Sequence, residues 1–262
     1  MSQESEKSAL ICPTLHHFGL VTAHQEEMLD WYTRVLGMTT NFQSSWEMET
    51  GASAGLAFVS NDRAHHRLAL VSWPGMRDDT DKQTHVKIQQ VAFEYATIDD
   101  LLNSWERLKG LGIEPVLTAD HGPTSAFYYH DPDGNIIELF ADTFGDWDKS
   151  TEYVRTSPEC HQNSMGTYID PEQLIMARKA GATLAELHRR ASAGEFSPSR
   201  PMDPRVLRLC CKKGGGVVSS ASIQEHQRSS LHEPTESVQM ASLRSRDYSP
   251  VRALGTAIGH GG

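Results

Sequence analysis

The stretch LHHFGLVTAHQEEMLDWYTRVLG, residues 15–37, reads as one short strand followed by one amphipathic helix. Its first eight residues are rich in apolar side chains, which is typical of a strand. After the polar residues 24–27, apolar side chains return at helical spacing, at positions 28, 29, 31, 32, 35 and 36. Gly37 suits the left-handed turn that ends many helices. This order of strand, helix and turn decides the fold, because it occurs twice.

The second copy is IQQVAFEYATIDDLLNSWERLKGLG, residues 88–112, in which a strand pattern again precedes a helical one. Gly37 lies 20 residues after His17, and Gly112 lies 22 residues after Gln90. The strand and the helix therefore have nearly equal lengths in the two copies. An internal repeat is the simplest explanation.

Each copy continues with further strands. In the first copy, alternating apolar side chains indicate strands at 57–61 and 67–73. In the second copy, strands at 126–130 and 136–140 flank the turn DPDGN, whose residues favour a tight reversal of the chain. The order of strand, helix and strands predicts two βαβββ modules, which span residues 14–78 and 79–145.

The remaining sequence divides into an extension and two polar ends. The segment Asp170-Pro171-Glu172 is a good helix start, and apolar side chains follow it at helical spacing. We expect residues 146–195 to form a helical extension of the modules. Residues 196–262 are rich in serine, glycine and mixed charge and cannot bury enough apolar surface to offset the entropy of ordering, so we expect a largely disordered tail. We expect residues 1–13 to be a flexible N-terminus.

The composition limits the classes of partner. The 262 residues are 38% hydrophobic and 22% charged, enough to bury a sizeable core. A net charge of -10 and a pI near 5.7 argue against nucleic acid or an anionic membrane surface as a partner. No run approaches the roughly 18 apolar residues of a membrane span. The N-terminal residues lack the apolar core of a signal peptide and the four cysteines have no C-x-x-C spacing, so we expect a cytoplasmic protein with free thiols.

Several motifs occur in an order that resembles one protein superfamily. They are LHHFGL with WYTRVLGM, NDRAHHRLAL, VAFEYATIDDLL with ERLKGLGIEP, HGPTSAFYYHDPDGNIIELF and IDPEQLI. Together they resemble the vicinal oxygen chelate superfamily of glyoxalase I, bleomycin-resistance proteins and extradiol dioxygenases, and especially its small biphenyl-2,3-diol dioxygenase-like proteins. The resemblance covers residues 14–195 and implies an α+β fold, in which paired βαβββ modules form a cup-shaped mixed sheet.

The same resemblance implies a site for one divalent metal ion. His17, Gln90 and Glu138 fall at its three ligand positions, although the extradiol branch carries a second histidine where this chain has Gln90. Two histidines and a carboxylate leave three open positions on ferrous iron, enough for a vicinal diol and dioxygen. Iron(II) is the expected ion, with manganese(II) and zinc(II) as alternatives. When HRLAL of the first copy is aligned with NIIEL of the second, Ala69 takes the position of Glu138. Because alanine cannot bind a metal, this favours three protein ligands over four.

Further residues are expected around the substrate. By the resemblance, His121 handles the substrate proton and Tyr128 donates a hydrogen bond to a substrate oxygen. One of Tyr128 and its neighbour Tyr129 is expected to serve only packing. We expect an apolar pocket lined by the helical extension and by His66, Trp73, Phe93 and Phe127.

Plainer interpretations exist for the three ligand positions. A histidine in an apolar strand is more often structural than a ligand. A carboxylate in a strand can simply face water, as Glu138 would in a sheet with one wet face. Gln90 is equally consistent with an ordinary hydrogen-bonding residue in a pocket that holds no metal. Only the place of these residues in the repeat favours the metal.

Three functions are consistent with the sequence. The first is a metal-dependent oxygenase that cleaves or oxidises an aromatic diol or a polyketide-like phenol with dioxygen. The second is an isomerase, cyclase or lyase that works through an enolate without oxygen. The third is a non-catalytic protein that binds a small aromatic molecule. A homodimer is consistent with all three.

Overall fold

The structure of the chain is a computed structural model that describes residues 12–82 and 85–202. The chain divides into two compact units, residues 1–212 and 213–262, and the second unit lies outside the described residues. Most of the expected N-terminal segment and most of the expected disordered tail also lie outside them. Among the residues that are described, no helix is long and apolar enough to cross a membrane.

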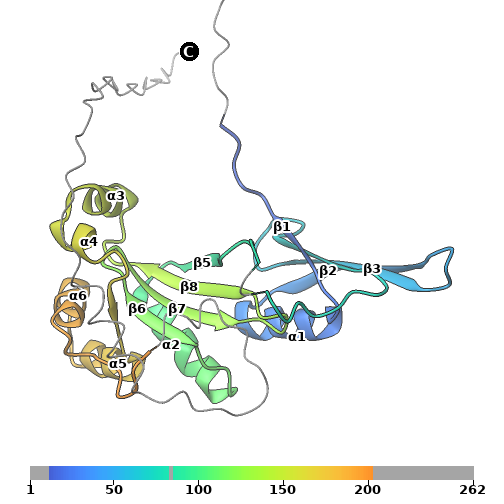
Figure 1. The fold of residues 1–262 in the computed structure, drawn as a ribbon. Helices are drawn as coiled ribbons and strands as arrows, with labels where there is room; N and C mark the ends of the chain where they lie inside the picture. The colour runs from blue at the N-terminus through green and yellow to red at the C-terminus, as the bar shows by residue number, and fades with distance from the viewer. Residues whose placement is uncertain (1–11, 83–84, 203–262) are drawn as a thin grey trace, which may run out of the picture. The chain divides into compact units, whose positions relative to one another are not determined.

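The first module is one helix and a four-stranded sheet in the order β1-β4-β3-β2. Strand β1 runs parallel to β4, and the other pairs are antiparallel. Helix α1 ends at Gly37, whose φ of 65° is the left-handed conformation expected from the sequence. Figure 1 shows β2 and β3 as a long hairpin. The elements are β1 (Phe18–Val21), α1 (Gln25–Leu36), β2 (Thr39–Glu47), β3 (Ser53–Ser60) and β4 (Leu68–Ser72).

The second module repeats this topology, with β5 parallel to β8 and the sheet order β5-β8-β7-β6-β9. Its elements are β5 (Val91–Tyr95), α2 (Ile98–Gly110), β6 (Leu117–Asp120), β7 (Thr124–His130) and β8 (Ile136–Asp142), with β9 (Thr167–Tyr168) added at the edge. The predicted α+β fold with paired βαβββ modules is confirmed. Hydrogen bonds divide the strands into two mixed sheets, one for each module.

Each sheet buries one face against its helix. In module 1 the core face carries Leu68 and Leu70, and in module 2 it carries Phe127 and Leu139, all fully or almost fully buried in one shared cluster with α1 and α2. Strand alternation turns Glu138, between the core residues Ile137 and Leu139, to the opposite face. We call this opposite side of the module 2 sheet the site face.

The helical extension consists of α3 (Trp147–Thr156), α4 (Pro158–Gln162), α5 (Pro171–Lys179) and α6 (Leu184–Ser192). The Arg178 guanidinium ties α5 to α2 through two hydrogen bonds to Asp99, of 2.7 and 2.8 Å. The packed chain continues further than expected, because Phe196 is only 2% exposed and Met202 packs against the site face. Residues 196–202 therefore belong to the folded unit, while the rest of the expected tail, 203–262, lies outside the described residues.

Candidate functional site

Four of the predicted site residues form a hydrogen-bonded row on the site face. His121 Nε2 lies 2.7 Å from the Tyr128 hydroxyl oxygen, and this oxygen lies 3.0 Å from Glu138 Oε1. The side-chain amide of Gln90 donates a hydrogen bond to Glu138 Oε2. Register explains the row, because Tyr128 and Glu138 are directly opposite each other on β7 and β8, and Gln90 precedes β5, the other neighbour of β8. His121 lies in the loop between β6 and β7.

Glu138 is a buried carboxyl group, with 7% of the residue exposed. Burial raises its pKa, and the hydrogen bond from Tyr128 opposes this shift. Its hydrogen-bond partners, Tyr128 and Gln90, are uncharged, and no lysine or arginine pairs with it among the described residues. A buried carboxylate without a cationic partner is costly, so a positive ion would stabilise the charged form.

The contact made by Nδ1 of His121 determines which of the two ring nitrogens carries the hydrogen. His121 Nδ1 lies 2.9 Å from the backbone carbonyl oxygen of Met165. Because a carbonyl oxygen only accepts, Nδ1 carries the hydrogen and donates it. Nε2 of the neutral ring is then left with a lone pair facing Tyr128. Burial lowers the pKa of His121, which favours this neutral form.

Tyr128 links the histidine to the carboxyl group. Burial, the first cause, and the neighbouring Glu138 raise the pKa of its hydroxyl above the ordinary value, so the hydroxyl stays protonated. A hydroxyl has a single hydrogen and cannot donate to His121 and Glu138 at once. With a neutral His121 and an ionised Glu138, one of the two contacts therefore lacks a hydrogen. The row can accommodate one more proton, on Nε2 or on the carboxyl group.

The loop that carries His121 is fixed by residues that the sequence analysis missed. Asp120 Oδ1 accepts a hydrogen bond of 2.8 Å from the Gly122 backbone and lies 2.9 Å from His188 Nδ1 on α6. Gly122 has a φ of +97°, and a Cβ there would lie 2.7 Å from the Tyr153 ring. Asp120 could have been suspected because it directly precedes His121. No spacing in the sequence points to His188 or to the Met165 carbonyl.

His17 does not belong to this hydrogen-bonded row. It precedes β1, its Nδ1 lies 2.9 Å from Nδ1 of His16, and its ring centroid lies 4.1 Å from that of His66. Within the described residues it has no hydrogen bond to Gln90 or Glu138. It lines a crevice of about 350 Å³ together with Ala92, the residue paired with Glu138 across β5 and β8.

The donors fit a divalent cation in part. Glu138 supplies an uncompensated carboxylate, and Gln90 is already in contact with it and has an amide oxygen that can coordinate. His17 offers an imidazole on the wall of the crevice. Two of the three predicted donors are therefore in contact, and the ligand role of all three stays a prediction.

A second group of potential metal ligands lies away from this row. One atom each of His24, Asp78 and Asp133 lie within 4.8 Å of one another. His24 Nε2 is 2.7 Å from Asp78, and His24 Nδ1 is 2.9 Å from Glu27. The hydrogen bond to Asp78 raises the pKa of His24. Ion pairing at the surface accounts for these contacts.

The predicted pocket residues lie in two different places. His66 is 6% exposed and stacks on Phe58 at 4.2 Å in module 1, where Trp73 is 41% exposed. Phe127 is fully buried in the core shared with the helices, and Phe93 packs against this core. Phe93 also lines the crevice that His17 and Ala92 share, so its place at a substrate pocket stays a prediction, whereas Phe127 faces the core. Strand alternation explains it, because Phe127 is adjacent to Tyr128 in β7 and must face the other side.

Comparison with known proteins places this geometry in a family. A sequence profile of the Glyoxalase/Bleomycin resistance protein/Dioxygenase superfamily matches residues 14–139. Biphenyl-2,3-diol 1,2-dioxygenase 2 of Rhodococcus globerulus is 34% identical over 189 residues, which cover 72% of this chain and 94% of that protein. Biphenyl-2,3-diol 1,2-dioxygenase 3 of the same organism is 34% identical over 183 residues, 70% of this chain and 91% of that protein.

A solved structure adds a looser match. The glyoxylase/bleomycin resistance protein/dioxygenase domain from Frankia sp. EAN1pec is 17% identical, with a TM-score of 0.42, over 50% of this chain and 93% of that one. A superposition at this level supports no statement about function. The sequence relatives, which match more than two thirds of both chains, are sufficient for the family. The chain belongs to the Glyoxalase/Bleomycin resistance protein/Dioxygenase superfamily.

Proposed function

We propose that the chain is a metal-dependent dioxygenase that acts on an aromatic diol, or on a polyketide-like phenol, held through two neighbouring oxygens. The observation that carries this proposal is the row of His121, Tyr128 and Glu138, which puts a proton acceptor and a hydrogen-bond donor beside a buried carboxylate. The names of both Rhodococcus globerulus relatives, which are biphenyl-2,3-diol 1,2-dioxygenases, support the same reaction class.

Glu138, Gln90 and His17 are the residues that would hold the metal. Once bound, the metal would supply Lewis-acid and redox chemistry at the two neighbouring substrate oxygens. Glu138 contributes the negative charge that balances part of the cation, while Gln90 contributes a neutral oxygen donor. Burial of Glu138 keeps competing water away from this charge.

His121 would accept the proton that a diol loses on binding. The Met165 carbonyl occupies Nδ1–H, so the accepting atom is Nε2. The lowered pKa of His121 keeps the ring neutral near pH 7, which is the form that can accept a proton. Tyr128, 2.7 Å from Nε2, stays protonated and donates its hydrogen bond to a substrate oxygen.

The test is oxygen consumption by the metal-loaded protein. The chain is loaded with ferrous iron without oxygen and then mixed in a stopped-flow oxygen assay with catechol, 3-methylcatechol and 3-phenylcatechol. We expect oxygen uptake that Glu138→Ala abolishes and that Glu26→Ala, which removes an exposed carboxylate of α1, leaves unchanged. A wild-type protein that binds no iron, or consumes no oxygen with any diol, contradicts the proposal.

The role of Gln90 has its own test. Gln90→His should raise the affinity for ferrous iron, because imidazole binds this ion better than an amide does. Gln89→His is the matched control. Gln89 is exposed, and strand alternation turns its side chain away from the side that Gln90 faces. Equal iron affinities for the two variants and the wild type would place Gln90 outside the metal site.

The contact between Gln90 and Glu138 also favours a second candidate function. An amide that donates to the carboxylate keeps Glu138 as a hydrogen-bond acceptor, which suits isomerisation or elimination through an enolate without dioxygen. Product analysis under anaerobic conditions separates the two. Formation of product without oxygen supports the enolate reaction, and strict dependence on oxygen supports the dioxygenase.

A further inference from the structure

The turn of residues 163–166 in the helical extension lies directly against the backbone of the His121 loop. The turn leads into β9, whose Thr167 pairs with Asp120 at the end of β6, so Gly166 comes beside His121. A Cβ on Gly166 would overlap the Asp120 carbonyl oxygen and lie 2.6 Å from the Cα of His121. Any side chain at position 166 would push the two backbones apart, so glycine permits their contact.

Hydrogen bonds between Asn163 and Gly166 close this turn. The Gly166 N–H donates to the Asn163 carbonyl at 3.0 Å, and the Asn163 side-chain amide donates to the Gly166 carbonyl at 2.7 Å. Gly166 has a φ of +67°, in the left-handed region that favours glycine. In this conformation the carbonyl of Met165 lies 2.9 Å from Nδ1 of His121. The turn therefore presents one backbone acceptor to one ring nitrogen.

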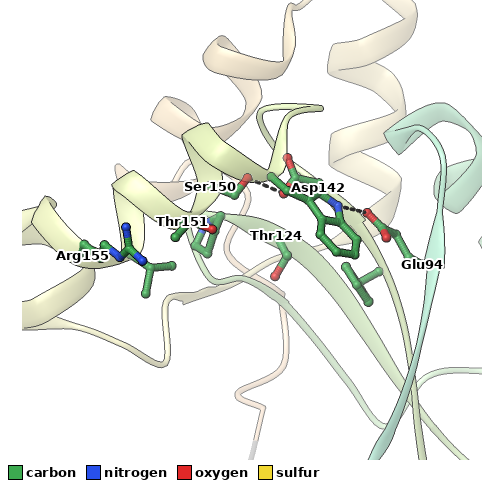
Figure 2. A pocket seen from close by; sticks show the side chains of 10 residues that line it. Glu94, Thr124, Asp142, Ser150, Thr151 and Arg155 are labelled. Carbon is green, nitrogen blue, oxygen red and sulfur yellow. Dashed lines mark hydrogen bonds between the residues drawn. The ribbon is translucent and has the colours of Figure 1, made fainter. Parts of the chain in front are cut away.

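The extension is attached to module 2 on both sides of this turn. Before the turn, the Ser150 hydroxyl of α3 donates a hydrogen bond to Asp142 at the end of β8 (Figure 2). The indole N–H of Trp147 donates another, of 3.3 Å, to Glu94 of β5. After the turn, β9 extends the module 2 sheet at β6. The position of the turn beside the His121 loop is therefore fixed by contacts on either side of it.

The neutral ring of His121 can carry its hydrogen on either nitrogen, and the row alone would favour Nε2. With the hydrogen on Nε2, the ring would donate to the Tyr128 hydroxyl at 2.7 Å, and that hydroxyl would donate to Glu138 at 3.0 Å. Both contacts of the row would then be hydrogen bonds. This form would be inert as a base, because Nε2 would have no lone pair left to accept a proton.

The Met165 carbonyl removes the advantage of that form. Two acceptors, Nδ1 and the carbonyl oxygen, would face each other at 2.9 Å, and the fixed backbone could not turn away. With the hydrogen on Nδ1, the ring donates to the carbonyl instead. The Tyr128 hydroxyl can then turn its hydrogen to Nε2, and Glu138 keeps the hydrogen bond from Gln90.

We propose that the turn of residues 163–166 is a tautomer lock for His121, with Gly166 as the positioning residue that lets the Met165 carbonyl reach Nδ1. The tautomer lock keeps the lone pair on Nε2, the nitrogen that faces the row. Gly166 acts only through His121. The use of this lone pair as the acceptor of a diol proton rests on the proposed function, whereas the choice of tautomer does not.

The first test measures the tautomer by NMR. Long-range proton–nitrogen spectra of the full-length protein, without added iron, distinguish a ring nitrogen that carries hydrogen from one that does not, and His121→Gln identifies the His121 signals by their loss. We expect hydrogen on Nδ1 in the wild type and on Nε2 in Gly166→Ala, because the added methyl group moves the carbonyl away. Gly181→Ala is the matched control, since Gly181 also has a positive φ, +97°, but open space at its Cβ. Hydrogen on Nε2 in the wild type, or on Nδ1 in all three proteins, would overturn the inference.

Asn163→Ala is a milder variant that replaces Gly166→Ala if the latter does not fold. It removes the 2.7 Å hydrogen bond to the Gly166 carbonyl from an exposed position, so the turn should loosen and part of the hydrogen should move to Nε2. Ser164→Ala, at an exposed position of the same turn, is its control and should keep the wild-type tautomer. In that case, hydrogen on Nδ1 alone in both variants would refute the tautomer lock.

Turnover separates this inference from the proposed reaction. Gly166→Ala should lower kcat for catechol on the order of a hundredfold and change KM by less than about twofold, because a general base is lost while the diol still binds. If the wild type turns over no diol but Gly166→Ala still moves the hydrogen to Nε2, the proposed reaction fails and the tautomer lock stands. If diols are turned over, and Gly166→Ala changes neither kcat nor the tautomer, the tautomer lock is refuted and the reaction stands.

Discussion

The two modules have the same topology, but the faces opposite their helices differ in exposure. The register pairs Gly19 with Ala69 in module 1 and Ala92 with Glu138 in module 2, so Ala69 and Glu138 hold equivalent places. The face of module 1 that carries Phe42 and Phe58 has aromatic side chains exposed by 47% at Phe42, 40% at Trp46 and 41% at Trp73. On the site face, Tyr128 and Glu138 are 4% and 7% exposed. We call the module 1 surface the open face.

The helical extension accounts for this difference. The extension and the segment that follows it contact the site face at three places: the Met165 carbonyl at His121, Trp147 at Glu94, and Met202 in the apolar cluster of Tyr128. No such cover exists for the open face among the described residues. Electrostatic interactions strengthen where water is excluded, so a carboxylate on the covered face of module 2 acts more strongly on a bound ion or substrate. The equivalent position on the open face of module 1 is Ala69, which carries no charge. The repeat supplies two similar sheets, and the extension covers part of the site face of the second.

We expect the largest effect at Glu138, because the equivalent position on the open face is the uncharged Ala69. Glu138→Gln keeps the shape and removes the charge, so we expect kcat/KM for catechols to fall roughly a thousandfold or more, beyond the 10 to 100-fold typical of residues that only support a metal ligand. Stability in urea should not fall, because burial already disfavours the charged form. Ala69→Glu, which places the same side chain on the open face, should create no second activity. Retained turnover in Glu138→Gln would remove the carboxylate from the mechanism.

We expect the next largest effect at Phe196, which anchors the end of the helical extension. Phe196 is 2% exposed, the Arg190 guanidinium lies 4.7 Å from its ring, and its carbonyl accepts a hydrogen bond of 2.7 Å from Asp170. Phe196→Ala should lower the free energy of unfolding by about 3 kcal/mol, as measured by urea denaturation. Activity should fall as well, because the extension holds the loop of His121. A loss below about 1 kcal/mol would show that the extension packs without this ring.

The ion pair between His188 of α6 and Asp120, next to the loop of His121, predicts that the stability of the fold depends on pH. The hydrogen bond to Asp120, the largest cause, raises the pKa of His188 above 6.5, while burial opposes this; Glu159 and Tyr153 are the other groups that face the ring. A raised pKa means that the protonated form stabilises the fold. This contribution is fully present below pH 6.5 and is lost as pH rises through the raised pKa.

A variant isolates this contribution. Relative to His188→Gln, the wild type should be more stable by on the order of 2 kcal/mol at pH 6, and the difference should shrink towards pH 9. Unfolding in urea at pH 6, 7, 8 and 9 measures it. A difference that is independent of pH would mean that His188 contributes only through packing and neutral hydrogen bonds.

Much of the fold follows from the sequence, and the exceptions have physical reasons. The two strand-helix units are legible because α1 and α2 each bury one apolar stripe. Strand β2 was not predicted because eight of its nine residues are exposed, so no alternation of buried and exposed positions exists to be read. Helix α3 lies within the predicted helical extension, but its bounds cannot be read from the sequence because it has no buried residue. Phe196 is a single aromatic residue in a polar stretch, and only its contacts reveal it.

Part of the site could likewise be predicted from the sequence, and part could not. The row of His121, Tyr128, Glu138 and Gln90 was expected together because the repeat and the family pattern place these residues on neighbouring strands. The contacts of His121 with Met165 and of Asp120 with His188 join residues 44 and 68 positions apart, and no local pattern encodes them. Glu94 could have been found, because alternation from Gln90 and Ala92 puts it on the same face. The same alternation places Phe127 on the core face, next to Tyr128 on the site face.

The smallest expected effect lies on the open face and tests whether it is open in solution. The ring centroids of Phe42 on β2 and Phe58 on β3 lie 5.5 Å apart, and such an aromatic pair contributes about 0.5–1.5 kcal/mol. Phe42→Thr keeps a residue that suits a strand, so the free energy of unfolding should fall by about 1 kcal/mol and kcat/KM should not change. A loss above about 2 kcal/mol, with a melting temperature that rises with protein concentration, would mean that a second chain covers this face. The contrast between the two modules would then hold for the single chain only.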